Sequence, residues 1–204
     1  NEEKWREILP NIKYVKGQLE RDIYITPYIS GTQVDIYLYR WRNDEDIFIE
    51  KVLYILKKYL SINECDMIPF QPTKQFEKIF GSSYPINQKC LSITNIDLLF
   101  SNLILTESEE MYNFDYEWIF DFPIPYEYVL WRSLVQLYGI YMIYLRDKIS
   151  KEEFCVKAGI SYHNLAIYNE MENHFAQYVF GENCSEKYKE RYRKQIINQS
   201  IDIV

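Results

Sequence analysis

The chain is predicted to be an α+β protein, with a small, mostly antiparallel sheet packed by several helices and a helical C-terminal half. Three observations predict this class. Short runs rich in Ile, Val and Tyr lie in the first part of the chain. Residues 113–122 alternate between aromatic and other side chains, which is the period of a strand. Helix-capping residues and helix-ending glycines punctuate the last third.

The length of 204 residues and a hydrophobic content of 48% favour one domain with a substantial core. We expect a sheet-containing part over residues 1–125 and a helical part over residues 126–204. The 20 tyrosines suit half-buried sheet faces and recognition surfaces. A compositional bias toward Tyr, Ile, Asn and Lys would explain the same count.

Two strands and a helix are predicted in the first third. The segments Asp22–Thr26 and Gln33–Trp41 are rich in Ile, Val and Tyr, and the link between them contains Pro and Gly, so a hairpin is expected. The segment Asp44–Leu60 places apolar residues on one helical stripe, and Asn43 is available to cap its start.

The next segment gives weaker signals. Residues 61–90 are broken by Pro and Gly and are expected to be irregular, apart from a short helix over Lys74–Phe80. Residues Asn95–Leu105 fit both a helical face, capped by Thr94, and a buried strand.

The clearest pattern lies in Asn113–Phe122, which is predicted to be a strand. A period of two puts five aromatic rings on one sheet face and three carboxylates on the other. Pro123 and Pro125 end the strand, and Pro125 suits the first turn of a following helix. We expect the aromatic face to lie against that helix.

Four helices are predicted after this strand. Tyr126–Arg146 is apolar on nearly all sides and should be central. Ser150 and Glu153 form a capping box for a short helix that ends at Gly159. Ser161 caps a longer helix to Phe180, ended by Gly181, and a polar, partly basic helix is expected over 186–198.

The net charge is concentrated in one stretch. The whole chain carries −7, whereas residues 90–131 contain no Lys or Arg and carry −8. The acidic residues of this stretch are Asp97, Glu107, Glu109, Glu110, Asp115, Glu117, Asp121 and Glu127. A field of one sign attracts cations or basic partners and repels nucleic acid.

The leading hypothesis is therefore a non-catalytic binding protein with an acidic, Tyr-rich surface that engages a basic protein. Immunity proteins of bacterial toxin systems, antitoxins and nuclease inhibitors share this size, this acidity and the lack of a catalytic motif, which is an analogy of class only. The expected contact residues are Asp115, Glu117 and Asp121 on the strand and Glu107, Glu109 and Glu110 before it. The partner could be a toxin or a nuclease; direct binding to nucleic acid or membrane is not expected.

The first alternative is a small enzyme that acts on a carbohydrate or nucleotide through the strand carboxylates. Residues i and i+2 of a strand lie about 6.5 Å apart, which is close to the spacing of paired glycosidase carboxylates. The same residues could hold a divalent cation or form a solvated sheet surface. This alternative predicts a concave pocket lined by Asp115 and Glu117.

The second alternative is a helix-turn-helix regulator formed by Lys151–Glu170, whose small, turn and apolar residues suit that motif. No Lys or Arg lies between Ala158 and Glu186, so the cations that neutralise phosphates are absent there. The basic helix at 186–198 could contact nucleic acid or an acidic membrane, or pair with the acidic strand.

No cofactor, metal or nucleophile motif is found. The four cysteines are widely spaced and are expected to be free, mostly buried thiols in a reducing compartment. His163 and His174 would lie about 16 Å apart along a helix and cannot share a metal ion. No secretory signal or membrane span is predicted, so a cytoplasmic location is expected.

Overall fold

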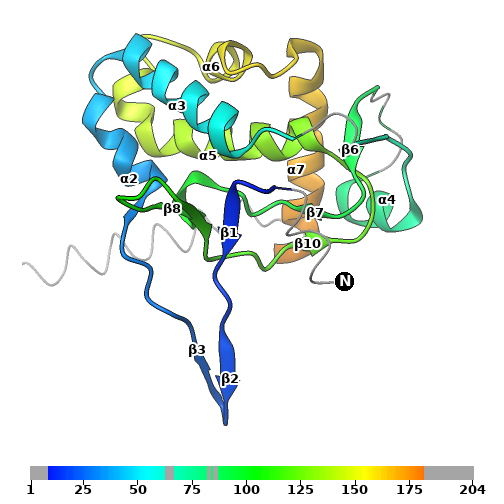
Figure 1. Ribbon diagram of the computed structural model, residues 1–204. Coiled ribbons are helices and arrows are strands. Elements are labelled where there is room, and N and C mark those ends of the chain that lie inside the picture. Colours follow the sequence, from blue (N-terminus) through cyan, green and yellow to red (C-terminus); the bar gives the residue numbers. More distant parts are fainter. Residues whose placement is uncertain (1–8, 63–66, 82–83, 85–86, 182–204) are drawn as a thin grey trace, which may run out of the picture.

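The computed structural model describes residues 9–62, 67–81, 84 and 87–181. It confirms the α+β class: small, mostly antiparallel sheets are packed by helices, and the part that follows residue 125 is helical (Figure 1). The predicted helix at 186–198 lies outside the described residues.

The largest sheet has four short strands in the order β1-β9-β8-β4. These strands are β1 (Ile12–Tyr14), β9 (Met111–Asn113), β8 (Leu103–Leu105) and β4 (Thr32–Gln33). β1 pairs with β9 in parallel, and the other two pairings are antiparallel. The first strand of the chain therefore joins the sheet next to a strand almost one hundred residues away, which sequence patterns cannot reveal.

Three smaller pairings complete the strand structure. β11 (Ile124–Pro125), β6 (Lys89–Leu91) and β5 (Ile68–Pro69) form a three-stranded sheet, and β10 (Ile119–Phe120) pairs with β7 (Thr94–Asn95). β2 (Gln18–Glu20) and β3 (Ile23–Ile25) form a separate hairpin that projects from the body (Figure 1).

The predicted hairpin between Asp22–Thr26 and Gln33–Trp41 is wrong in its second strand and therefore in its pairing. Residues 34–41, expected to be a strand, form helix α2 (Val34–Leu38) and the 3-10 turn η1 (Tyr39–Trp41). Val34 and Leu38 are fully buried, whereas Ile36 is 57% exposed. A strand would put all three side chains on one face, and a helix turns Ile36 away from the other two. The apolar run is short enough to fit either period, so burial decided between them. Strand β3, which lies within the predicted segment Asp22–Thr26, pairs instead with β2 to form the hairpin.

Several helices agree with prediction. Helix α3 (Glu45–Tyr59) begins at Asp44, whose carboxylate accepts a hydrogen bond from Ile47 N at 3.1 Å, so the cap is one residue later than expected. Helix α4 (Lys74–Phe80) is capped by Thr73 and has the predicted bounds. Residues 94–105, which fitted helix and strand equally, contain β7, the 3-10 turn η3 (Phe100–Asn102) and β8.

The C-terminal helices follow the sequence closely. Helix α5 (Tyr126–Leu145) is the central helix and buries residues on most of its sides. Helix α6 (Lys151–Lys157) has the predicted capping box of Ser150 and Glu153. Helix α7 (Leu165–Phe180) begins after a 3-10 turn, η4 (Tyr162–Asn164), so Asn164 rather than Ser161 holds its N-cap position, without a capping hydrogen bond from its side chain.

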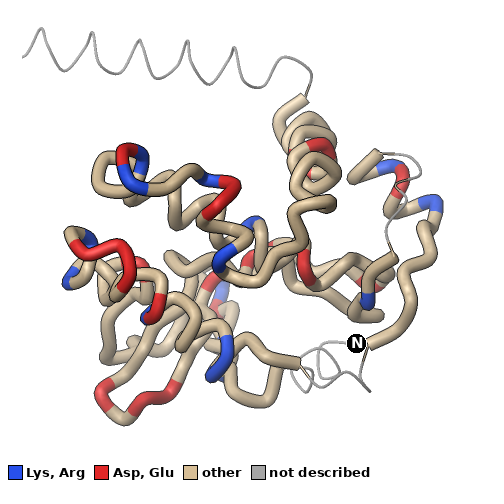
Figure 2. Tube along the Cα trace, turned by 90° about the horizontal axis from the view of Figure 1, so that it is seen from above, with Lys and Arg blue, Asp and Glu red and all other residues tan. Residues whose placement is uncertain are grey.

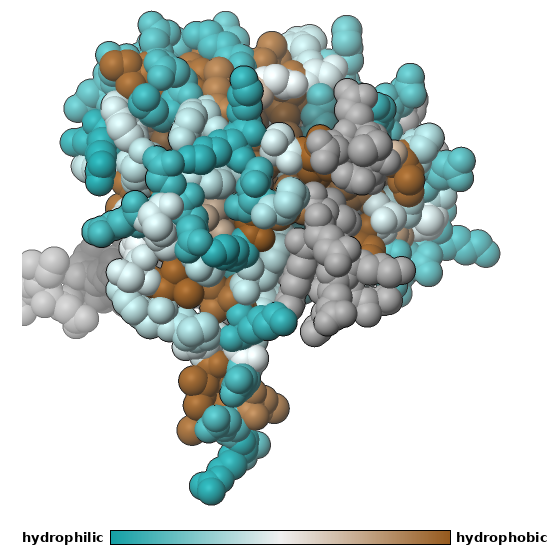
Figure 3. Space-filling view, viewed as in Figure 1, coloured by the Kyte–Doolittle hydropathy of each residue, from teal (hydrophilic) through white to brown (hydrophobic). Residues whose placement is uncertain are grey.

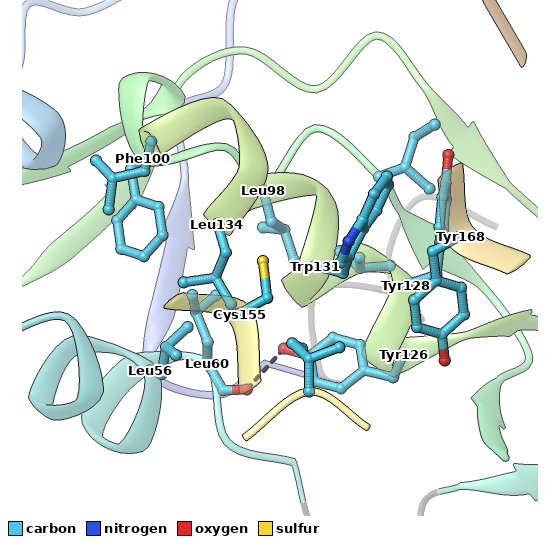
Figure 4. Close-up of a cluster of buried hydrophobic side chains, with 14 of the residues drawn as sticks. Leu56, Leu60, Leu98, Phe100, Tyr126, Tyr128, Trp131, Leu134, Cys155 and Tyr168 are labelled. Atoms are coloured by element: carbon cyan, nitrogen blue, oxygen red, sulfur yellow. Dashed lines mark hydrogen bonds between the residues drawn. The ribbon is translucent and has the colours of Figure 1, made fainter. Parts of the chain in front are cut away.

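The core lies between α5 and the elements around it (Figure 4). Tyr126 and Trp131 of α5 are buried there, with Leu60 at the end of α3 and Tyr168 on α7. The hydroxyl group of Tyr126 donates a hydrogen bond to Leu60 O at 2.6 Å, which satisfies a polar group inside an apolar cluster.

Candidate protein-binding surface

The segment 113–122 was predicted to be one continuous strand, and this was wrong. Strand pairing stops after Asn113 and resumes only at Ile119. Between them, Tyr116 donates a hydrogen bond to Val15 O at 2.6 Å, and Trp118 N donates to the carboxylate of Asp97 at 2.8 Å. Side-chain interactions therefore hold residues 114–118 where a sheet ladder was expected.

The aromatic face of this segment also has different neighbours from those predicted. Phe120 and Phe122 are buried, with Phe80 of α4 at 5.6 and 6.5 Å between ring centroids. Trp118 meets Phe175 of α7 edge to face at 5.2 Å. The rings pack against α4 and α7 rather than against α5, because these helices flank the strand end. Phe114, at the start of the segment, stays 38% exposed.

Two of the eight carboxylates of the acidic stretch are used inside the protein. Asp97 is 6% exposed and lies 3.3 Å from Arg132 of α5, which also contacts Glu172 of α7 at 3.0 Å. Tyr128 donates a hydrogen bond to Glu172 at 2.7 Å. Burial raises the pKa of Asp97, and the hydrogen bond from Trp118 N and the charge of Arg132 oppose that rise. This network fixes where the 114–118 segment runs.

Glu127, on α5, is the second internal carboxylate. It accepts hydrogen bonds from Ser161 N at 2.8 Å, from Asn164 Nδ2 at 2.6 Å and from Tyr168 at 2.6 Å. Three neutral donors thus satisfy the charge, and they join the start of α7 to the first turn of α5. Its role is therefore structural.

Two more carboxylates, both predicted to contact a partner, are held in surface ion pairs. Lys58 of α3 lies 2.5 Å from Glu109, and Lys13 of β1 pairs with Glu110. The hydrogen bond from Lys13 lowers the pKa of Glu110. In Figure 2, acidic and basic positions adjoin at several places along the trace. Glu109 and Glu110 therefore tie the turn between β8 and β9 to the body, and their charges are partly neutralised.

The remaining four acidic residues are exposed and make no hydrogen bond or ion pair within the described part of the chain. They are Glu107, Asp115, Glu117 and Asp121. Glu107 lies in the β8–β9 turn, whereas Asp115 follows the other end of that hairpin, so the four do not form one compact cluster. Asp115 and Glu117 lie closest together in the chain and directly follow the exposed ring of Phe114.

The most exposed apolar feature is the β2–β3 hairpin, which we call the arm and define as residues 18–25. Every residue of the arm is exposed. Leu19 faces the same side as its cross-strand partner Tyr24, and Ile23 and Ile25 face the other side. Their exposed fractions are 74%, 63%, 66% and 47% in that order. Figure 3 shows hydrophobic surface, in brown, on the projecting hairpin.

A surface hollow of about 320 Å³ lies at the base of the arm. Its lining is mostly apolar: Val15, Thr26, Pro27, Tyr28, Ile29, Ile104 and Phe114. Tyr28 is 90% exposed at its rim. The arm and the hollow at its base form one largely apolar surface that reaches Phe114, and Asp115 follows Phe114 in the chain. We call this the arm-base surface.

Sequence reasoning missed the arm, because it paired Asp22–Thr26 with the wrong segment. Two signals pointed to it: Leu19 and the apolar run Ile23–Ile25 lie on either side of Arg21 and Asp22, and Gly17 precedes them. A Cβ atom at Gly17 would lie 2.2 Å from the Tyr24 ring, so glycine lets the ring cross the strand. Arg21 has a positive φ of 51°, as the first position of a tight hairpin turn requires.

The best-formed surface hollows among the described residues have volumes of about 200 to 320 Å³, and their linings do not include Asp115 or Glu117. Within the same residues, no group of three or more His, Cys, Asp or Glu side chains is placed to hold a metal ion.

The histidines and cysteines lie apart from this surface. His163 is exposed on η4, and His174 of α7 lies against Gly81. Cys90 and Cys155 are buried free thiols, and burial raises the pKa of each to about 12. Cys65 and Cys184 lie outside the described residues.

Comparison of the chain with protein-family models, with curated proteins and with solved structures finds no match. Among the described helices, none combines the length and the apolar character that crossing a bilayer requires.

Proposed function

We propose that this protein is a non-catalytic binding protein that engages a basic protein through the arm-base surface. The observation that carries the proposal is the arm, whose two faces both expose large apolar side chains. A two-stranded hairpin is marginal in water, and contiguous exposed apolar surface marks interaction sites. A partner that covers the arm would remove this surface from water and hold the hairpin in place.

The charge around the arm base favours a basic partner. Asp115 and Glu117 are exposed and unpaired in the described chain, and they follow Phe114, which lines the hollow, within three residues of the chain. In protein complexes, central apolar and aromatic side chains hold the partners together, while rim charges select the partner and accelerate encounter. Leu19, Tyr24 and Tyr28 supply the anchors, and the carboxylates supply the rim.

The class of function that fits is the neutralisation of a basic protein, of the immunity-protein, antitoxin or nuclease-inhibitor type. An acidic protein of this type occupies the surface with which its target binds nucleic acid. The proposal places both proteins in the cytoplasm, since the toxins and nucleases of this class act on intracellular nucleic acid.

The test is affinity capture from a lysate of the organism that encodes the chain, at low and high salt, followed by mass spectrometry. We expect one stoichiometric basic protein whose capture weakens at high salt, because screening removes the rim attraction. The captured protein is then purified and its dissociation constant measured against variants.

Two variants and two matched controls decide the assignment of the surface. Leu19→Ser with Tyr24→Ser should weaken binding at least about tenfold by removing two anchors. Asp115→Lys with Glu117→Lys should weaken it chiefly through slower association. The controls are Leu53→Ser, an exposed apolar site on α3, and Asp147→Lys with Glu152→Lys, exposed carboxylates near α6. Equal affinities of the two surface variants and the two control variants for the partner would refute the assignment of binding to the arm-base surface.

A further inference from the structure

A second surface hollow, of about 200 Å³, lies between helix α2 and the C-terminal half of α5. Its lining residues are Asp35, Ile36, Tyr39, Ile140, Tyr141 and Tyr144. Tyr141 is 3% exposed and forms the floor, whereas Ile36 and Ile140 are half exposed at the rim. No residue of the arm-base surface contributes to it, so it is a separate feature of the molecule.

The three tyrosines surround the hollow with their rings. The ring centroids of Tyr39, Tyr141 and Tyr144 are each 6.4 Å from the other two. Tyr39 and Tyr144 stand nearly perpendicular, at 86°. A cation between them would lie within the distance of about 6 Å over which a cation and an aromatic ring attract each other. The arrangement resembles the aromatic cages that hold organic cations.

The same rings already bind one guanidinium group from within the chain. Arg42 lies 3.6 Å from the ring centroid of Tyr39 and 5.4 Å from that of Tyr144. Arg42 is not among the residues that line the hollow, so its guanidinium group leaves the hollow open. This internal contact shows that these rings accept a planar cation in the folded protein.

A carboxylate completes the hollow. Asp35 Oδ1 accepts a hydrogen bond from Ile36 N at 2.8 Å, and Tyr141 donates to Asp35 O at 2.5 Å, which fixes both residues. Burial raises the pKa of Tyr141, the charge of Asp35 adds to that rise and the charge of Arg42 opposes it, so both charges act at the hollow. A planar cation would contact rings on its faces and a carboxylate at its edge, as a guanidinium group prefers.

We propose that this hollow binds the guanidinium group of an arginine side chain presented by the basic partner. That the arginine belongs to a basic partner protein rests on the proposed function; that the hollow binds an arginine side chain does not. Arginine is favoured because it stacks on aromatic rings and hydrogen-bonds to carboxylates with one planar group, which an ammonium group cannot do.

The experiment is an NMR titration of protein labelled with ¹³C in its tyrosine rings. The probe is N-acetyl-arginine amide, and its neutral isostere, N-acetyl-citrulline amide, is the control ligand. We expect saturable shifts at Tyr39 and Tyr144 with the arginine probe, and binding of citrulline weaker by about tenfold, since it keeps the shape and loses the charge. Equal binding of the two probes, or no shift with arginine, would overturn the proposal.

Two variants locate the site. Tyr39→Leu removes one wall, and Asp35→Asn removes the charge while keeping the hydrogen bond to Ile36 N; each should weaken arginine binding several-fold. Tyr162→Leu, at an exposed tyrosine on η4, is the control. If Tyr39→Leu does not fold, the Asp35→Asn result decides. Arginine binding with no basic partner captured would refute only the proposed function, and capture without arginine binding would refute only this site.

Discussion

The guanidinium group of Arg132 lies 3.3 Å from the carboxylate of Asp97, although 35 residues separate the two positions. The same Arg132 contacts Glu172 and lies 5.2 Å from the ring centroid of Phe175. One side chain of α5 thus holds both the loop before η3 and helix α7. Because Asp97 also binds Trp118 N, this pair positions the segment that carries Asp115 and Glu117.

Replacing Arg132 by Met should destabilise the protein by about 3–5 kcal/mol, because Asp97 and Glu172 would keep their charges without a buried cation. Urea denaturation measures the change. Adding Asp97→Asn to this variant should recover part of the loss. Arg146→Met removes an exposed ion pair with Asp147 and should change the free energy of unfolding little. A loss of similar size in both single variants would contradict the assigned role.

Gly81 and Gly159 provide a matched pair of substitutions. Both have a positive φ, 91° and 97°, so alanine at either site costs about 1–2 kcal/mol of backbone strain. At Gly81 the new Cβ atom would also lie 2.6 Å from the His174 ring, whereas at Gly159 it would meet nothing within 4 Å. We expect Gly81→Ala to cost about 1–3 kcal/mol more, from overpacking against α7.

Urea denaturation of the two variants compares these costs directly. Equal losses of unfolding free energy would mean that the atoms packed against Gly81 move aside for the new Cβ atom at no cost in stability. If Gly81→Ala costs more, adding His174→Ala should recover part of the difference; the Cβ atom would also lie 2.6 Å from Tyr84 Oη, which remains.

The capping box of α6 should make stability depend on pH. Hydrogen bonds from the backbone and then the side chain of Ser150 lower the pKa of Glu153. Its contribution is therefore present above its usual pKa of 4.5 and is lost as the pH falls through the lower pKa of the folded state. The stability difference between the native protein and Glu153→Gln should shrink over that range.

Thermal unfolding measured at several pH values tests this difference. Glu152→Gln, one residue away and outside the capping box, is the matched control. A constant difference between the native protein and Glu153→Gln over the whole range would contradict the role of the charged cap.

The buried thiols should resist modification in the folded protein. Burial raises the pKa of Cys90 and of Cys155 to about 12, so at neutral pH both are thiols rather than reactive thiolates. Iodoacetamide should leave both unmodified in the folded protein and label both in concentrated guanidinium. Mass spectrometry of the digested protein identifies the labelled positions. Rapid labelling of Cys155 in the folded state would show that α6 opens readily.

Local chemistry determined the helices. The carboxylates and hydroxyls at Asp44, Thr73 and Ser150 accept hydrogen bonds from the first turn of the following helix, and Gly159 and Gly181 have the positive φ that ends one. These interactions span three or four residues, so the amino-acid pattern contains them. The α+β class followed from the same signals.

Which strands pair, and which carboxylates form ion pairs, depended on the tertiary structure. The alternation at 113–122 predicted which rings are buried toward its end, Phe120 and Phe122, but Asp97 and Val15 interrupt the strand from distant positions. Likewise, the charge of residues 90–131 was visible in the sequence, whereas its pairing with Lys13, Lys58 and Arg132 was not.

By itself, the sequence determined most of the helices, the central helix among them, and the location of the negative charge, since these depend on neighbouring residues and on composition. Only the tertiary structure decided that residues 34–38 form a helix, that residues 18–25 project as an apolar arm, and which carboxylates stay unpaired. Burial and long-range pairing decide these features, and both depend on residues far apart in the chain being brought together by folding.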